Sequence, residues 1–314
     1  MALDPQAKAV VELVIKSGRP AYHTLSPKEA RQLFRETRPA STPTPPEIGT
    51  VKTLSANGAD GPIPLRVYRP VGVADDVQLP GLVYFHGGGW VIGDLDTHDV
   101  QCRQLTAEAR ITVISVDYRL APEHKFPAAV DDALVATRCV ARHGPELGVD
   151  IRRLAVGGDS AGGNLAAVVA LLARDSTEGP VIAFQVLVYP VTDLGSESQS
   201  YQDFADGYLL TRDSMRWFTN HYLRSPEDAG GWRASPLRAK SLAGLPPALI
   251  ITAGHDPLRD EGAAYAARLT EAGVRVDYVC YGGMIHGFMP MGRLLDTGNR
   301  ALSHVAATLR EALR

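Results

Sequence analysis

Residues 154–162 read Leu154-Ala155-Val156-Gly157-Gly158-Asp159-Ser160-Ala161-Gly162, and a helix-forming run follows at residues 164–173. Gly158, Ser160 and Gly162 have the G-x-S-x-G spacing, in which a serine occupies a sharp turn between a strand and a helix. Glycine fits on both sides because the residues two before and two after the serine crowd together. The pattern predicts that Ser160 is a nucleophile; a glycine-rich turn without chemistry is the alternative. The amide of Ala161, at the start of the helix, is expected to favour a developing negative charge.

Short apolar runs alternate with helical segments on both sides of this turn. The runs are residues 82–85, 111–116, 154–156, 181–188, 248–252 and 274–279. The predicted helices are residues 97–109, 127–143, 161–174 and 258–272. Strands that are apolar on both faces and are followed by helices indicate a mostly parallel sheet with helices on both faces. In such a sheet, functional residues follow the carboxyl ends of the strands.

A second glycine-rich motif, His86-Gly87-Gly88-Gly89-Trp90, directly follows the apolar run 82–85. Consecutive glycines let the backbone approach a ligand closely and aim amides into a cleft, as an oxyanion hole requires. We expect the amides of Gly88 and Gly89 to form this hole together with Ala161. A phosphate-binding loop is the alternative, but no Gly-Lys-Ser/Thr follows the glycines. His86 itself is interpreted as an anchor of the loop.

A nucleophilic serine needs a base, and the base should follow a strand late in the chain. Nine histidines are present, and His286 meets this requirement because it follows the run 274–279. His255 also follows a strand, but Asp256 beside it is better placed as an acid. Since adjacent side chains diverge, one loop position cannot easily supply both groups. The sequence therefore predicts that His286 is the base for Ser160.

The base in turn needs a carboxylate that fixes its tautomer. Asp256 follows the run 248–252 and is the predicted acid. Asp260 and Glu261 are alternatives, but both fall in the first turn of a predicted helix, where acids favour the helix dipole. The order Ser160, Asp256, His286 along the chain is that of α/β-hydrolases.

The chain divides by composition into three predicted regions. Residues 1–46 are expected to form an N-terminal helical arm, with one helix at residues 4–17, a second that begins behind Ser26, and an extended linker at residues 42–46. Residues 47–192 and 246–314 form the predicted catalytic core. Its first two strands, residues 47–55 and 63–69, are expected to be an antiparallel edge joined by a turn near Asn57-Gly58. Residues 193–245 are a predicted cap insertion with one helix at residues 212–223 behind Thr211.

Composition excludes several other classes of protein. The 314 residues are 45% hydrophobic and 21% charged, and the net charge is −3, without the basic excess of a nucleic-acid-binding protein. Three cysteines, Cys102, Cys139 and Cys280, lie far apart without a C-x-x-C pair, which favours reduced thiols over a disulfide scaffold or a zinc site. Neither a signal peptide nor a membrane-spanning run is recognised, so we expect a cytoplasmic protein without stable membrane insertion.

Taken together, these motifs resemble the bacterial hormone-sensitive lipase family of α/β-hydrolases. The resemblance spans about residues 50–314 and rests on five segments. They are His86–Trp90, Tyr118-Arg119-Leu120-Ala121-Pro122-Glu123, 158–163, 256–261 and His286-Gly287-Phe288. One departure is Gly283, a position where proline is commoner in the family. The segment from Tyr118 to Pro122 is structural in the family.

The resemblance implies a serine carboxylesterase that hydrolyses esters with short to medium acyl chains through the Ser160, Asp256 and His286 triad. It also implies an α/β-hydrolase fold with a helical cap and no metal or organic cofactor. The expected partner is a small-molecule ester. A homodimer is possible through the last strand, residues 274–279.

Other interpretations stay open. The same triad could serve an amidase or peptidase, or a lipase that acts at an oil–water interface. A non-catalytic ligand receptor on this fold is a further alternative, although such receptors lose the base. Apolar residues of the insertion could line an acyl pocket or could simply attach the cap to the sheet. They are Tyr201, Phe204, Tyr208, Leu209, Met215, Trp217, Phe218 and Tyr222.

Overall fold

The computed structural model describes residues 2–74 and 76–314, and these form an eight-stranded sheet in the order β1-β2-β4-β3-β5-β6-β7-β8. The strands are β1 (Thr50–Gly58), β2 (Gly61–Arg69), β3 (Leu79–Phe85), β4 (Thr112–Val116), β5 (Val149–Asp159), β6 (Phe184–Val188), β7 (Ala248–His255) and β8 (Val276–Ile285). β1 pairs with β2, and β2 pairs with β4, in antiparallel fashion, and the remaining pairs are parallel. The predicted mostly parallel sheet with an antiparallel edge is confirmed.

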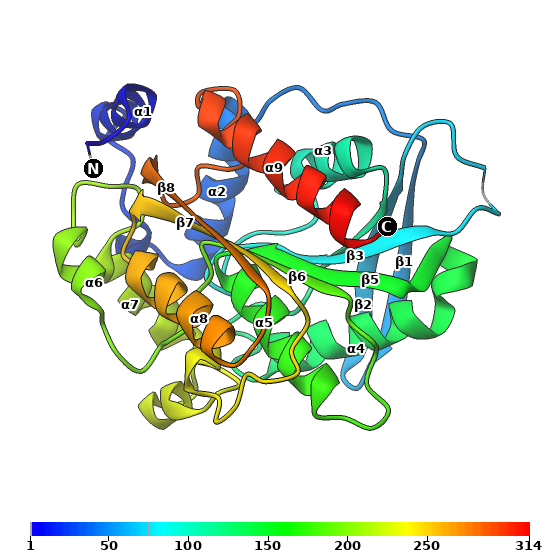
Figure 1. Cartoon of the computed structure of the whole chain (residues 1–314). Helices are drawn as coiled ribbons and strands as arrows, with labels where there is room; N and C mark the ends of the chain where they lie inside the picture. Colours follow the sequence, from blue (N-terminus) through cyan, green and yellow to red (C-terminus); the bar gives the residue numbers. More distant parts are fainter. Residues whose placement is uncertain (1, 75) are drawn as a thin grey trace.

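Helices cover both faces of the sheet (Figure 1). They are α1 (Pro5–Lys16), α2 (Pro27–Ser41), α3 (Asp99–Ala109), α4 (Ala128–His143), α5 (Ala161–Arg174), α6 (Gln199–Asp203), α7 (Arg212–Tyr222), α8 (Arg259–Glu271) and α9 (Asp296–Ala312). α3 and α9 pack together on one face, whereas α4, α5 and α8 share the core of the other face. α1, α6 and α7 lie beyond the carboxyl ends of β7 and β8 (Figure 1).

The strands at the centre of the sheet are buried on both faces, which explains their continuous apolar runs. In β3, Val83 and Phe85 join the core of α4 and α5, while Leu82 and Tyr84 join the core of α3 and α9. All four side chains are almost completely buried. Burial of each such side chain stabilises the fold by about 1.5–3 kcal/mol. The sheet is therefore a rigid base for the loops at its carboxyl edge.

The N-terminal helices begin where the sequence predicts. Ser26 caps α2 in a capping box, because its hydroxyl accepts the Glu29 amide and the Glu29 carboxylate accepts the Ser26 amide. Residues 43–48 contain no helix or strand, as the prolines predict. Within the described residues, no helix has both the length and the apolarity needed to cross a bilayer.

Three features of the fold differ from expectation. The turn between β1 and β2 is Ala59-Asp60, because Asn57 and Gly58 still pair with β2. β5 begins at Val149, before the predicted run 154–156. Polar residues in the first half of the strand interrupt the apolar pattern and hide this start. α9 was not predicted, although its buried residues recur at helical spacing.

Candidate active site

Ser160 occupies the turn between β5 and α5 in a strained conformation. Its φ of 55° and ψ of −117° lie outside the regions that non-glycine residues favour, at a cost on the order of 1–3 kcal/mol. The Ser160 amide donates to the Val188 carbonyl (2.8 Å), and its carbonyl accepts the Asn164 amide (3.1 Å). A side chain at Gly162 would collide with the Phe85 carbonyl, so only glycine fits there. The turn holds the hydroxyl clear of the helix.

The structure brings Ser160, His286 and Asp256 into one hydrogen-bonded chain. His286 Nε2 lies 3.0 Å from Ser160 Oγ, and His286 Nδ1 lies 2.6 Å from Asp256 Oδ2. Asp256 is fully buried, and its second oxygen accepts the Leu258 amide at 2.8 Å. This arrangement lets Nδ1 donate to the carboxylate while Nε2 accepts the serine proton.

Pairing of β7 with β8 explains why two residues 30 positions apart meet. Asp256 directly follows β7, and His286 directly follows β8, its parallel neighbour.

The two alternative acids, Asp260 and Glu261, form hydrogen bonds elsewhere. Asp260 accepts the Ser200 amide at 2.9 Å. The Glu261 carboxylate accepts the amides of Thr192 and Asp193, so it ties α8 to the loop after β6.

The glycine loop after β3 borders the same cavity as Ser160. Gly88 and Gly89 have φ values of 122° and 57°, which glycine adopts without strain. Side chains at these positions would collide with the Ile92 carbonyl and the Phe218 ring, respectively. Gly87, Gly88, Gly89 and Ser160 all line the cavity. The predicted loop and nucleophile are therefore neighbours.

Asp159 connects the nucleophile turn to the glycine loop. Its Oδ1 accepts the Tyr84 hydroxyl at 2.7 Å and the Gly87 amide at 3.1 Å, and lies 3.5 Å from His98 Nε2. Burial opposes ionisation, but the charge and hydrogen bond of His98 and the hydroxyl of Tyr84 hold the pKa of Asp159 well below its usual range. A buried, charged Asp159 therefore fixes the loop relative to Ser160. The G-x-S-x-G spacing alone does not indicate this role for Asp159.

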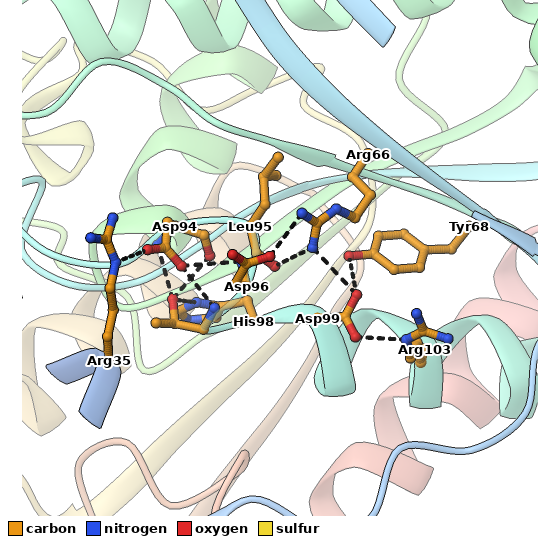
Figure 2. Close-up of polar contacts among 10 residues, drawn as sticks. Arg35, Arg66, Tyr68, Asp94, Leu95, Asp96, His98, Asp99 and Arg103 are labelled. Carbon is orange, nitrogen blue, oxygen red and sulfur yellow. Dashed lines mark hydrogen bonds and ion pairs between the residues drawn. The ribbon is translucent and has the colours of Figure 1, made fainter. Parts of the chain in front are cut away.

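The segment that carries His98 is held by a polar network (Figure 2). Asp94 accepts the Thr97 amide at 2.8 Å and pairs with Arg35 of α2 at 2.5 Å. Arg66 of β2 bonds to Asp96 at 2.8 Å and contacts Asp99 at 3.4 Å (Figure 2). These contacts from α2 and β2 position the loop that presents His98 to Asp159.

His86 anchors the glycine loop through contacts of its ring and its carbonyl with Tyr118. Its ring stacks on Tyr118 with centroids 4.3 Å apart, and its carbonyl accepts the Tyr118 hydroxyl at 2.7 Å. The Ala121 amide donates to the Trp90 carbonyl at 2.8 Å, which holds the other end of the loop. Burial and the charge of His98 lower the pKa of His86 to about 4, so its ring is neutral near pH 7.

A cavity of about 610 Å³ contains Ser160 and His286. Four of the aromatic and apolar residues predicted from the insertion line it, namely Tyr208, Leu209, Met215 and Phe218. Tyr201, Phe204, Trp217 and Tyr222 do not line it; Tyr222 instead stacks on Trp90 with centroids 4.0 Å apart. The insertion thus supplies both pocket lining and attachment to the core.

A large part of the lining comes from the two N-terminal helices, which no motif marks as pocket residues. α1 contributes Val10, Leu13 and Val14, and α2 contributes Phe34 and Arg38. Their helical spacing could have indicated an apolar face, but not what that face covers.

Tyr189 also lines the cavity, and its ring packs against the His286 imidazole with the two centroids 4.7 Å apart. Tyr189 directly follows β6 at the carboxyl edge of the sheet, and this position could have indicated a place in the site.

In residues 2–74 and 76–314, no group of three or more His, Cys, Asp or Glu side chains is arranged to hold a metal ion.

A mostly parallel sheet, with a serine at the sharp turn after β5 and a histidine and an aspartate after β8 and β7, defines an α/β-hydrolase. A family model for the alpha/beta hydrolase fold matches residues 82–290. The chain belongs to this family, in its hormone-sensitive lipase group.

Similarity to individual proteins extends over nearly the whole chain. Carboxylic ester hydrolase LipN of Mycobacterium tuberculosis is 47% identical over 84% of this chain and 70% of its own length. An ethyl acetate hydrolase of Pseudomonas putida is 40% identical over 100% of both chains. The structure of a hyperthermophilic esterase from Pyrobaculum calidifontis superposes with a TM-score of 0.93, at 43% identity and 99% coverage of both chains.

Proposed function

We propose that this chain is a serine carboxylic ester hydrolase that acts on small esters with short to medium acyl chains. The observation that carries the proposal is the position of His286, within hydrogen-bond distance of both Ser160 Oγ and Asp256 Oδ2. The names of the similar proteins, which include a carboxylic ester hydrolase and an ethyl acetate hydrolase, support the same activity.

The reaction would begin when Ser160 Oγ attacks the ester carbonyl while His286 Nε2 takes its proton. Asp256 would stabilise the resulting imidazolium through Nδ1. His286 then returns the proton to the departing alcohol, which leaves an acyl group on Ser160. A water molecule, deprotonated by the same imidazole, would release the acid and restore the hydroxyl.

The tetrahedral intermediates need hydrogen-bond donors for their oxyanion. We assign the amides of Gly88, Gly89 and Ala161 to this role, because the glycine loop and the start of α5 flank Ser160. Each such donor contributes on the order of 3–4 kcal/mol to transition-state stability. Asp159 supports the hole indirectly, through its bond to the Gly87 amide.

The cavity supports an acyl chain of limited length. Its lining is mainly apolar, from residues of α1, α2, α7 and the segment before α7. We propose that residues 1–46 and 193–245 together supply a cap over the carboxyl edge of the sheet, where α1, α6 and α7 lie in Figure 1. A cavity closed by such a cap favours small substrates over an oil–water interface.

A panel of p-nitrophenyl esters from acetate to palmitate tests the proposal. We expect kcat/KM to be highest for short or medium chains and to be abolished in Ser160→Ala. Parallel assays on the matching p-nitroanilides distinguish an esterase from an amidase. Ester hydrolysis that persists in Ser160→Ala, or binding without turnover in the wild type, would exclude the proposed function.

A further inference from the structure

One corner of the cavity carries two arginines. Tyr22, which precedes α2, lines the cavity together with Arg19 and Arg38. Both arginines lower the pKa of the Tyr22 hydroxyl, against the opposing and larger effect of burial. We call Arg19, Tyr22 and Arg38 the basic corner.

The basic corner has hydrogen-bonding capacity that the protein does not use. Within residues 2–74 and 76–314, the Arg19 guanidinium and the Tyr22 hydroxyl make no hydrogen bond, and neither arginine forms an ion pair. Arg38 uses only Nε, which donates to the Thr97 carbonyl at 3.1 Å. Its two terminal nitrogens make no hydrogen bond within the same residues, and Arg38 also borders a second pocket that contains Thr97.

Arg38 is held in place for such a role. Its guanidinium lies 5.3 Å from the centroid of the Phe34 ring, and the bond to Thr97 fixes Nε. A guanidinium positioned in this way presents its remaining donors to a planar anion with little loss of side-chain entropy.

The corner lies near the reacting groups. The Tyr22 ring packs against Phe218 with centroids 6.1 Å apart, and Phe218 in turn packs against Gly89 of the glycine loop. Arg38 also lowers the pKa values of Asp159 and Tyr189, although burial and other charges outweigh this effect for Tyr189. The charge of Arg38 therefore acts on Asp159, which precedes Ser160 in the chain, and on Tyr189, which packs against His286.

Two acids also line the cavity and must be weighed against these charges. Asp159 is buried, and its carboxylate is already bonded to Tyr84, Gly87 and His98. Glu36 is exposed and accepts a bond from Gln32 at 2.8 Å, so solvent screens its charge. An anion beside Ser160 would be repelled by Asp159, whereas an anion at the basic corner would not compete with either acid for its donors.

We infer that the basic corner binds a carboxylate carried by the substrate, so that the preferred esters bear an anionic group away from the scissile bond. This inference rests on the proposed esterase function and narrows its substrate class. The carboxylate would accept hydrogen bonds from Arg38 and Tyr22, with Arg19 as a second charge.

Two pairs of esters test the inference. In the first, the anion is on the acyl side, as mono-p-nitrophenyl glutarate against p-nitrophenyl pentanoate. In the second, it is on the alcohol side, as the butyryl ester of para-hydroxybenzoate against the butyryl ester of methyl para-hydroxybenzoate. The quantity measured is the ratio of kcat/KM within each pair, and comparison of this ratio between variants cancels the intrinsic reactivity of the esters.

The variants are Arg38→Gln, which removes the charge, Arg38→Lys, which keeps it, and Lys28→Gln as a control. Lys28 is exposed on the same helix, and it does not line the cavity. For one of the two pairs, we expect Arg38→Gln to lower the anionic-to-neutral ratio on the order of tenfold or more. Arg38→Lys should restore part of the ratio, and Lys28→Gln should leave it unchanged.

The outcomes separate this inference from the proposed function. If neither ratio depends on Arg38, or if Lys28→Gln lowers a ratio as much as Arg38→Gln, the basic corner is not a carboxylate site. Hydrolysis of the neutral esters would then still support the esterase. If no ester of either kind is hydrolysed, the proposed function itself fails.

Discussion

The imidazole of His286 bonds to two other side chains, and each bond sets a different property. The 2.6 Å contact with Asp256 selects the tautomer with a proton on Nδ1, and the 3.0 Å contact with Ser160 then leaves Nε2 free to accept.

Asp256→Asn should leave the fold intact but lower kcat by about 10³–10⁴-fold, because the amide favours the wrong tautomer of His286. Steady-state kinetics with p-nitrophenyl butyrate measures the effect. Asp260→Asn is the matched control, since Asp260 bonds to Ser200 instead of His286. A loss in the control as large as in Asp256→Asn would show that Asp256 is the wrong acid.

Asp159→Asn tests whether Asp159 positions the glycine loop. The amide can still accept from Gly87, but it loses the charge beside His98, so the loop should shift slightly from its place near Ser160. We expect kcat to fall by about tenfold with little change in KM, because oxyanion donors act mainly in the transition state. A rise in KM with unchanged kcat would instead indicate a role in substrate binding.

At the scale of elements, the apolar patterns of strands and helices do not predict the contacts that position the loops around Ser160. The apolar runs and the glycine turns predicted the sheet, its antiparallel edge and the helices that cover it. The same patterns could not show that Asp159 bonds to Gly87, 72 positions away, because that contact depends on the register of β3 beside β5. Nor did they show which face of α2 turns Arg38 toward the cavity.

Glu261, at the start of α8, has a different role from the one expected from its position in the sequence. We expected this acid to favour the helix dipole, but its side chain is buried and accepts the amides of Thr192 and Asp193. Burial raises the pKa of Glu261 to about 8, although these two bonds oppose the shift. The folded protein therefore keeps a proton that the unfolded chain loses at lower pH.

Because the folded pKa is raised, Glu261 reduces stability as pH rises from the unfolded value of 4.5 toward 8. Glu261→Gln keeps an oxygen for both amides and carries no titrating proton. Between pH 6 and 8, urea unfolding should show the wild type losing about 2–3 kcal/mol relative to this variant. Parallel pH dependences of the two proteins would contradict a protonated Glu261.

At the scale of the whole molecule, the cavity forms only where distant parts of the chain meet. Helices near the N-terminus, the glycine loop, the insertion and the His286 loop each supply part of its wall. Sequence motifs identified the groups at its base, because those follow strands. They could not give its volume, which depends on how α1, α2 and α7 pack over the sheet edge.

Leu209, from the insertion, lines this cavity and should limit the length of the acyl chain. Leu209→Ala should raise kcat/KM for octanoate relative to butyrate, by about fourfold for each methylene newly accommodated. Val181→Ala is the control, because Val181 is exposed and lies outside the cavity lining. An unchanged ratio in Leu209→Ala would mean that Leu209 attaches the insertion to the core without shaping the pocket.

The most direct test of the central claim is covalent labelling with a p-nitrophenyl phosphonate, followed by mass spectrometry of the peptides. The account predicts one phosphonyl group per chain, located on Ser160, with p-nitrophenol released in equal amount and labelling abolished in His286→Ala. A label on another residue, or labelling of Ser160 that proceeds at an unchanged rate without His286, would contradict it.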